Sequence, residues 1–242
     1  MNGLNARGKS EKASPRLWIA LDVPDEEAAE YWMRTFPQHR HYKIGMELFY
    51  QIGPQRMRAW IEEKELDIFL DLKLHDIPRT VAHAIARLDK LGVRLTTIHL
   101  AGGVEMCEAA KEASSTMDIV GVSVLTSLSE EDLARIGIND PLPEHIRRLV
   151  ALAQQAELQG VVVSGQELQE VTAIWPGARF VVPGIRRQQE PSQDQKRVIT
   201  ASQAMLWGAT DLVIGRTLLH ARNPRGVYQE FQRLLPEGEI LS

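Results

Sequence analysis

The sequence predicts an α/β protein built as a single-domain (β/α)8 barrel, the TIM-barrel architecture. Eight short runs of apolar or β-branched residues recur along the chain, and apolar residues between them fall at helical spacing. Strands that alternate with helices indicate a parallel sheet, and eight such units indicate a closed barrel. A length of 242 residues with 44% hydrophobic residues suits one α/β barrel with one core. No linker rich in Pro, Gly or Ser divides the chain.

The eight predicted strands share short length and a predominance of apolar side chains. Each is followed by a polar or helical segment, as expected when a parallel strand leads into a crossover. The predicted strands are residues 17–23, 42–46, 68–74, 95–100, 119–125, 161–164, 180–182 and 212–215.

The intervening segments carry helix signals. After Thr80, apolar residues recur every three or four positions, and Gly92 is placed to end that helix. The same spacing follows Glu144, where Gly160 is expected to be the stop. Asp25 is a good N-cap and is followed by two glutamates in the first turn.

Composition excludes several classes of function. The net charge is −4 and the pI about 6.0, so the chain has no electrostatic footprint for nucleic acid, although a local basic pocket for a small anion stays compatible with these values. Cys107 is the single cysteine, and no Cys/His spacing resembles a zinc site. We therefore expect neither an intrachain disulfide nor a bound metal.

The ends and apolar runs of the chain indicate its location. Residues 1–15 are polar and lack an apolar run, which predicts a flexible leader rather than a signal peptide, with the barrel domain at residues 16–242. The longest apolar runs are far too short to span a bilayer. The sequence therefore predicts a soluble cytoplasmic protein that does not bind membranes.

A β-type run at residues 67–76 carries charges where a buried strand should end. Asp71 and Lys73 lie two residues apart, so both point to the same face of the strand as Phe69. Asp76 follows just beyond the strand and completes an Asp-x-Lys-x-x-Asp series. Because burying charge is costly unless it is paired, a structural ion pair is one explanation. The other polar residues of the chain favour a catalytic one.

These further polar residues also fall at the carboxyl ends of predicted strands. Asp22 ends the first strand, Lys43 lies in the second with Gly45 two places on, and Thr126 follows the fifth. Loops after the strands form the active face of a (β/α)8 barrel, so polar ends indicate catalysis or ligand binding. Taken singly, Asp22 could instead be a turn former and Lys43 a snorkelling side chain.

The pair Gly215-Arg216, after the eighth strand, indicates a phosphate site. Barrels often bind phosphate with the loops after strands seven and eight. Glycine lets a backbone N–H approach a phosphate oxygen, and arginine offers a planar fork to it. Arg186 and Gln195 could close over the same group. Arg216 on its own could be a surface charge at a helix start.

Two long polar loops stand out, at residues 127–143 and 184–198. Long loops in a compact domain are more often functional or mobile than structural. The second contains Arg187, which is expected to face solvent.

The central series closely resembles a known family signature. Residues Asp71-Leu72-Lys73-Leu74-His75-Asp76-Ile77-Pro78 match the Asp-x-Lys-x-x-Asp motif of the orotidine 5′-phosphate decarboxylase family. Two departures, Ala101 where Ser is expected and Gln193 where Gly is expected, lie outside the charged series. Supporting matches follow the family order, cover residues 17 to about 220, and stand at residues 20–22, 43–49, 124–127, 182–186, 194–197 and 213–216.

The resemblance implies a cofactor-free homodimer that converts orotidine 5′-monophosphate to uridine 5′-monophosphate, the last step of de novo UMP synthesis. By resemblance, Lys73 donates a proton to C6 of the pyrimidine and Asp71 stands beside the departing carboxylate. Asp76 is lent across the dimer interface, so that the two active sites are shared. Lys43 joins the charged array.

The resemblance also assigns the contacts with the rest of the substrate. Asp22 and Lys43 hold ribose hydroxyls, Thr126 and Gln195 help to fix the base and the closing loop, and the residues of the predicted phosphate site take the phosphate. In full, the implied substrate-binding residues are Asp22, Lys43, Asp71, Leu72, Lys73, Leu74, His75, Asp76, Ile77, Pro78, Arg79, Thr80, Thr126, Pro183, Arg186, Gln195, Gly215 and Arg216.

Two histidines near the series are expected to be mainly structural. His75 alternates away from Lys73, toward the neighbouring helix. His99 precedes a glycine pair at the end of the fourth strand and is expected to pack or to form hydrogen bonds rather than act as a base.

Two other functions compete with this interpretation. A sister barrel enzyme could act on a sugar phosphate with Mg²⁺ held by the aspartates. Against it, Lys73 stands between the acids and the Gln195 loop would have no role. A catalytically silent barrel could bind a nucleotide as a sensor, but the charged tetrad exceeds what binding requires.

Overall fold

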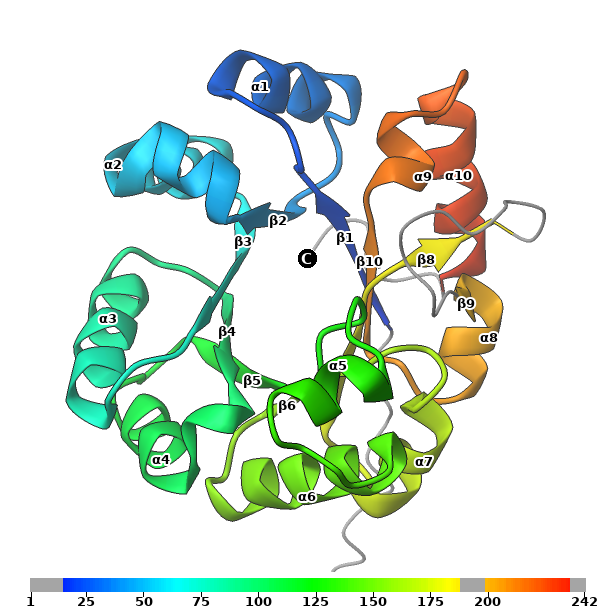
Figure 1. The fold of residues 1–242 in the computed structure, drawn as a ribbon. Coiled ribbons are helices and arrows are strands. Elements are labelled where there is room, and N and C mark those ends of the chain that lie inside the picture. The colour runs from blue at the N-terminus through cyan, green and yellow to red at the C-terminus, as the bar shows by residue number, and fades with distance from the viewer. Residues whose placement is uncertain (1–14, 188–198, 236–242) are drawn as a thin grey trace, which may run out of the picture.

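The barrel predicted from the sequence is confirmed in the computed structural model, which describes residues 15–187 and 199–235 (Figure 1). Eight parallel strands close in the order β1-β10-β7-β6-β5-β4-β3-β2, so each barrel strand pairs with the next one along the chain. Every predicted strand is present. The barrel strands are β1 (Arg16–Ala20), β2 (His41–Gly45), β3 (Asp67–Leu74), β4 (Leu95–His99), β5 (Asp118–Val122), β6 (Gly160–Val162), β7 (Arg179–Val182) and β10 (Asp211–Ile214).

Helices surround the barrel between successive strands, as Figure 1 shows in a view down its axis. A small parallel pair, β8 (Ile185–Arg186) and β9 (Ile199–Thr200), lies outside the barrel wall. No helix in the described ranges is long and apolar enough to cross a membrane. The helices are α1 (Glu26–Thr35), α2 (Met46–Lys64), α3 (Pro78–Lys90), η1 (Leu100–Gly102), α4 (Val104–Glu112), α5 (Glu130–Arg135), α6 (Leu142–Gln155), α7 (Leu168–Ile174), α8 (Ala201–Leu206), α9 (Arg216–Leu219) and α10 (Pro224–Leu234).

Two of the predicted helix signals are confirmed. Asp25 is the N-cap of α1, and its side chain accepts a hydrogen bond from the Ala28 N–H at 2.9 Å. Gly92 follows α3 with a φ of 83°, a left-handed conformation that glycine adopts without a steric penalty.

The prediction that Gly160 stops a helix is wrong. Helix α6 ends at Gln155, and Glu157 takes the left-handed conformation with a φ of 52°. Gly160 instead begins β6, where an added Cβ would collide with the backbone carbonyl of Arg179 on the neighbouring strand. A glycine is needed there because the two backbones approach closely.

Two apolar layers stabilise the barrel, and polar contacts close one of its ends. One layer lies between strands and helices, and a smaller buried cluster fills the interior. The interior cluster consists of Trp18, Ala20, Phe69, Leu95, Val120, Val181 and Val213. At the amino ends of the strands, the Trp18 Nε1–H donates to Asp211 at 2.6 Å, and Arg179 pairs with both Asp211 and Asp118. The barrel is therefore closed at this end.

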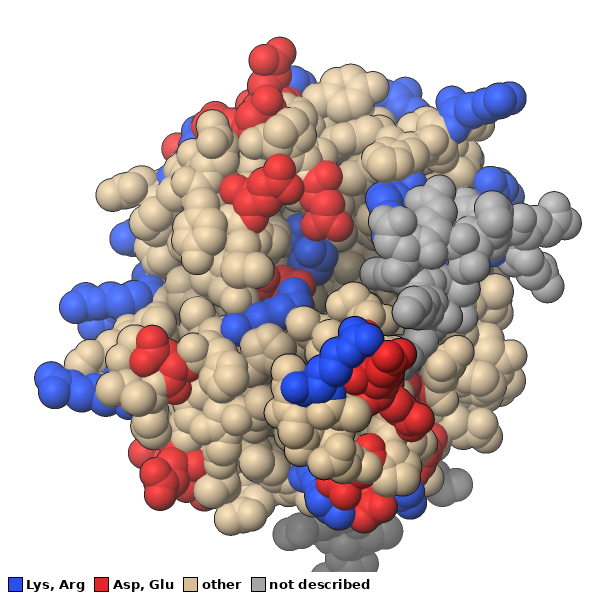
Figure 2. Space-filling view, viewed as in Figure 1, with Lys and Arg blue, Asp and Glu red and all other residues tan. Residues whose placement is uncertain are grey.

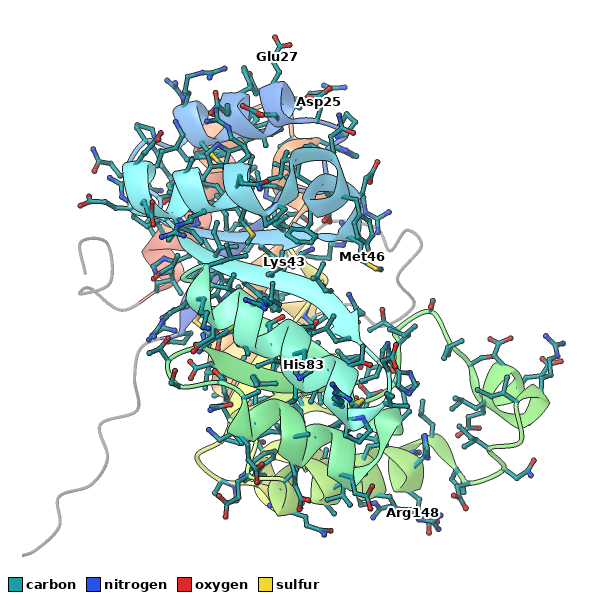
Figure 3. All side chains as sticks on the ribbon, turned by 90° about the vertical axis from the view of Figure 1, so that its left-hand side faces the viewer. Asp25, Glu27, Lys43, Met46, His83 and Arg148 are labelled. Carbon is teal, nitrogen blue, oxygen red and sulfur yellow. The ribbon has the colours of Figure 1, made fainter. Side chains whose placement is uncertain are left out.

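The predicted loop at residues 127–143 carries the short helix α5. Ser129 and Asp132 form a capping box, in which the Asp132 N–H donates to Ser129 Oγ at 3.3 Å and the Ser129 N–H donates to Asp132 Oδ2 at 3.0 Å. Figure 3 shows this green segment projecting from the barrel at the end that also carries Met46. The loop thus has a defined structure of its own.

Asp89, near the end of α3, ties this helix to the loop before β5. Its carboxylate accepts hydrogen bonds from the backbone N–H groups of Ser115 and Thr116, both at 3.1 Å, and of Met117 at 2.9 Å. Burial raises the pKa of Asp89, but these bonds and those from the Ser115 and Thr116 hydroxyls outweigh it and hold the pKa well below its usual range.

Replacing Asp89 by asparagine is expected to lower the free energy of unfolding by about 1–3 kcal/mol near neutral pH, because charge-assisted hydrogen bonds are lost. The folded pKa lies below the unfolded value of about 3.9, so the wild-type advantage is fully present above that pH and is lost progressively as the pH falls from there through the lowered folded pKa. Urea unfolding at a series of pH values from about 7 down to about 2 follows this loss.

The matched control is Asp140→Asn, which removes an exposed ion pair with Arg148. We expect that variant to change stability by less than about 0.5 kcal/mol. Equal losses in the two variants, or an Asp89→Asn loss that stays constant at acid pH, would contradict the proposed role of Asp89.

Candidate active site

A cavity of about 220 Å³ opens at the carboxyl ends of the barrel strands, with the interior cluster as its floor. Figure 2 looks onto this face and shows Lys/Arg and Asp/Glu side chains meeting in a central hollow. Figure 3 places Lys43 among the strands and Met46 nearer the rim. Nine of the predicted substrate-binding residues line the cavity: Asp22, Lys43, Asp71, Lys73, Thr126, Pro183, Arg186, Gly215 and Arg216.

Four charged side chains of alternating sign form a continuous array in this cavity. Lys73 Nζ lies 2.7 Å from Asp71 Oδ2, and Lys43 Nζ lies 3.9 Å from the same oxygen. Lys43 Nζ also donates a hydrogen bond to Asp22 Oδ1 at 3.0 Å. The structure therefore joins residues from β2, β3 and the segment after β1 into one network, hereafter called the charged array.

Asp71 is the central anion of the charged array, and its side chain is 15% exposed. Burial raises the pKa of this carboxyl, but the charges of Lys43 and Lys73 and hydrogen bonds from Lys73 and Thr97 outweigh burial and lower the pKa. Asp71 is therefore ionised at neutral pH. It provides a fixed negative charge next to the Lys73 ammonium.

Lys73 has an unusual backbone conformation. Its φ is 49°, in the left-handed region, and the register of β3 against β4 shifts between Leu70 and Leu74. The Lys73 backbone N–H donates to Thr97 Oγ1 at 2.8 Å. A positive φ in a residue with a side chain is uncommon and is concentrated at functional sites.

The arginines that follow β7 and β10 line the same cavity. Arg186 is 7% exposed, and its Nη1 donates to Thr217 Oγ1 at 3.1 Å. Its buried Nε has no hydrogen-bond partner among the described residues. Leaving a buried donor unsatisfied is costly, so an anionic ligand would stabilise this side chain.

Two glycines keep space open beside the charged array. A Cβ on Gly215 would lie 3.4 Å from Asp22 Oδ2, and one on Gly45 would lie 3.7 Å from Lys43 Nζ. The predicted space next to Lys43 is therefore present. Gly215 is also the N-cap of α9, which places Arg216 at the first position of that helix.

Comparison with known proteins agrees with this geometry. A family model described as the orotidine 5′-phosphate decarboxylase / HUMPS family matches residues 15–231. A protein from Shewanella sediminis named orotidine 5′-phosphate decarboxylase is 43% identical and covers 85% of this chain and 91% of its own length. A protein of that name from Erythrobacter litoralis is 42% identical, with 90% and 98% covered.

The chain belongs to the orotidine 5′-phosphate decarboxylase / HUMPS family. The family resemblance drawn from the sequence is thus confirmed. A solved structure of the orotidine 5′-phosphate decarboxylase from Lactobacillus acidophilus has a TM-score of 0.80 at 30% identity and covers 91% of this chain and 98% of its own. The barrel of the family is therefore present over nearly all of the described residues.

Not every residue that the family resemblance implied lies at the cavity. Asp76 is exposed, and its carboxylate accepts a hydrogen bond from the Ile77 N–H at 2.6 Å, whereas no ion pair joins it to Lys73 in the described part of the chain. Leu72 and Leu74 pack against the outer core. Gln195 lies outside the described residues. The remaining residues that do not line the cavity are His75, Ile77, Pro78, Arg79 and Thr80.

The two histidines near the family motif lie against each other. The rings of His75 and His99 have centroids 5.6 Å apart. His99 is half-buried; burial, followed by the charges of His75 and Lys73, lowers its pKa. A packing role for His99 was predicted. His75 is exposed and lies beside η1, where its Cδ2 would be 3.3 Å from a Cβ on Gly102, and its structural role stays a prediction.

Sequence reasoning missed three polar residues of this family site. Ser164 lies two residues beyond the end of β6, is buried, and donates a hydrogen bond to Glu167. Thr217 follows Arg216 and holds Arg186. Both satisfy the criterion of polar residues at strand ends and could have been found. Thr97 lies within β4, next to a second threonine, and nothing in the local sequence marks it as part of the site.

Proposed function

We propose that the protein decarboxylates orotidine 5′-monophosphate to uridine 5′-monophosphate without a cofactor. The observation that carries the proposal is the charged array, in which the Lys73 ammonium lies 2.7 Å from the ionised Asp71 at the mouth of the barrel. The names of the family relatives support the choice of substrate.

The reaction breaks the bond between C6 of the pyrimidine and its carboxylate carbon. CO2 leaves, the electron pair stays on C6, and the Lys73 ammonium gives its proton to that carbon. Lys73 is then a neutral amine and regains a proton from solvent. Because the vinylic carbanion has no electron sink of its own, an ammonium aimed at C6 is the main resource for stabilising it.

Asp71 and Lys43 prepare Lys73 for this step. The negative charge of Asp71 attracts the Lys73 ammonium at 2.7 Å and holds it in the cavity, and Lys43 lies 3.9 Å from the same Asp71 oxygen. In this proposal the substrate carboxylate sits beside Asp71 and leaves as neutral CO2. Charge positioned before the reaction needs little reorganisation at the transition state.

The remaining cavity residues bind the parts of the substrate that are distant from C6. In this proposal Asp22 and Lys43 bind the ribose hydroxyls, and Arg186, Gly215 and Arg216 bind the phosphate; all five line the cavity. The unsatisfied Nε of Arg186 is a ready donor to a phosphate oxygen. Binding energy from the phosphate can then be used to stabilise the transition state at C6.

The proposal includes a homodimer in which Asp76 completes the partner's site. Asp76 and the neighbouring Ile77, which is 65% exposed, lie beyond β3 and are accessible to a second copy. A large exposed apolar side chain next to an active-site motif is suited to an interface. Location in the cytoplasm stays a prediction from the sequence.

The rival function, a Mg²⁺-dependent reaction on a sugar phosphate, fits the charged array less well. Asp71 Oδ2 already contacts Lys73, and Oδ1 accepts a hydrogen bond from Thr97 at 2.8 Å. A divalent cation at this carboxylate would meet two ammonium groups, which repel it.

The deciding experiment follows the ultraviolet absorbance of orotidine 5′-phosphate in the presence of pure protein and excess chelator. Loss of absorbance at an undiminished rate supports the proposed reaction. An inert protein, or activity that chelation abolishes and Mg²⁺ restores, would refute it.

We expect Arg216→Ala to lower kcat/KM for orotidine 5′-monophosphate by about 100-fold, since a charged contact with the phosphate is lost. For a substrate that lacks the phosphate, added phosphite dianion should raise the activity of the wild type more than that of the variant. Steady-state kinetics with both substrates measure the effect.

The matched control for Arg216 is Arg187→Ala. Arg187 is exposed and pairs with Glu230 at 2.9 Å, and the prediction that it faces solvent is confirmed. This control should keep wild-type kinetics. If phosphite activated the wild type and Arg216→Ala equally, Arg216 would have no role at the phosphate.

A further inference from the structure

We propose that Thr97 is a positioning residue for catalysis, because its hydroxyl holds Asp71 and the backbone of Lys73 in one fixed arrangement. This inference rests on the proposed function and adds a residue to its machinery. Thr97 lies in β4, is fully buried, and touches the charged array from the neighbouring strand.

The directions of its hydrogen bonds are determined by chemistry. A backbone N–H can only donate, so the Lys73 N–H donates to Thr97 Oγ1 at 2.8 Å. An ionised carboxylate can only accept, so the Thr97 hydroxyl donates to Asp71 Oδ1, also at 2.8 Å. One hydroxyl therefore acts as acceptor for one residue of the charged array and as donor for the other.

The backbone of Lys73 needs this contact. Three residues with a side chain have a positive φ in the described ranges, and two of them, Glu65 and Glu157, stand just after helices. Lys73 instead has its φ of 49° inside strand β3, where the register against β4 shifts. Because such a conformation persists only when its surroundings hold it, the bond to Thr97 fixes the direction in which the Lys73 side chain leaves the strand.

Asp71 is oriented by the same hydroxyl. Thr97 occupies Oδ1, while Lys73 Nζ lies 2.7 Å from Oδ2. With both oxygens engaged, rotation of the carboxylate would break at least one contact. Loss of the hydroxyl would free Asp71 to turn and leave the partly buried Lys73 N–H without this acceptor.

The neighbouring Thr96 provides a matched control. It is also fully buried in β4, and its hydroxyl donates to the Leu70 carbonyl at 2.8 Å. Successive residues of a strand face opposite sides, so Thr96 points away from the side on which Thr97 contacts Asp71. Thr96→Val and Thr97→Val each remove one buried hydroxyl, but the charged array is affected in the second variant alone.

The test compares steady-state kinetics of four proteins on orotidine 5′-monophosphate, with folding checked by circular dichroism. Thr97→Val should lower kcat by roughly 10- to 100-fold with little change in KM, because small misplacements of reacting groups are costly while the phosphate contacts remain. Thr97→Ser should restore most of the loss. Thr96→Val should retain the kcat of the wild type.

The outcomes separate this inference from the function on which it rests. If the wild type is inactive, both fail. If the wild type is active and Thr97→Val keeps kcat within about twofold, or Thr96→Val loses as much as Thr97→Val, the positioning role is overturned and the proposed function stands. If Thr97→Val does not fold, Thr97→Cys replaces it. A thiol is a weak donor and acceptor, so the kcat of Thr97→Cys should lie below that of Thr97→Ser. Equal kcat values in these two variants would overturn the positioning role.

Discussion

Replacing Lys73 by alanine is expected to lower kcat by roughly 10⁴-fold or more while the fold and the phosphate affinity are kept. Lys73 supplies both the proton for C6 and the positive charge beside it. Lys43, the other cation of the charged array, pairs with Asp22 at 3.0 Å and lies 3.9 Å from Asp71, whereas Lys73 lies 2.7 Å from it. Lys43 therefore cannot take over the proton transfer.

Single-turnover and steady-state assays, together with binding of uridine 5′-monophosphate, measure this effect. Lys90→Ala is the matched control, because Lys90 is an exposed lysine in the last turn of α3 and should have no influence on kcat. A Lys73→Ala protein with a tenth of the wild-type kcat would be incompatible with Lys73 as the proton donor.

Mixing inactive Lys73→Ala and Asp76→Ala proteins is expected to restore roughly a quarter of wild-type activity. With free exchange of subunits, about half of the dimers are heterodimers. If Asp76 serves the partner's site, one site of each heterodimer carries both substitutions and the other carries neither. One site in about four is then intact.

The matched control mixes Lys73→Ala with Asp71→Ala. These two residues contact each other within one chain, at 2.7 Å, so every site in that mixture keeps a lesion and no activity should return. Subunit exchange is verified independently with differently tagged chains. If the Lys73→Ala and Asp76→Ala mixture also stayed inactive after exchange, Asp76 would not be shared, and the chemistry assigned to Lys73 would stand alone.

The sequence was sufficient to predict the barrel and the charged residues that line the cavity. Parallel strands bring their carboxyl ends to one face, so polar residues that are far apart in the chain, such as Asp22, Lys43 and Arg216, had to converge once the strands were recognised. For Asp71 and Lys73, the local sequence was sufficient to predict that they lie together. Two residues apart on a strand, they share a face, and the structure joins them directly.

Gly160 shows where the chain pattern was misleading. A glycine that follows an apolar helical stretch is a common stop signal. Here the helix ended earlier, and the glycine was required by the Arg179 backbone on the adjacent strand. A close approach between two backbones depends on how the strands pair in the sheet, so it cannot be predicted from the local sequence.

The sequence by itself determined the barrel, the charged residues at its active face and the family to which they belong. The tertiary structure alone decided how those charges are held: the left-handed backbone of Lys73, the hydroxyl of Thr97 that serves Lys73 and Asp71, and the pairing of Arg186 with Thr217. Composition and periodicity report which face a residue occupies, because burial follows the period of the strand or helix. Hydrogen bonds between strands depend on register, and a bulge such as that in β3 changes register without a sequence signal.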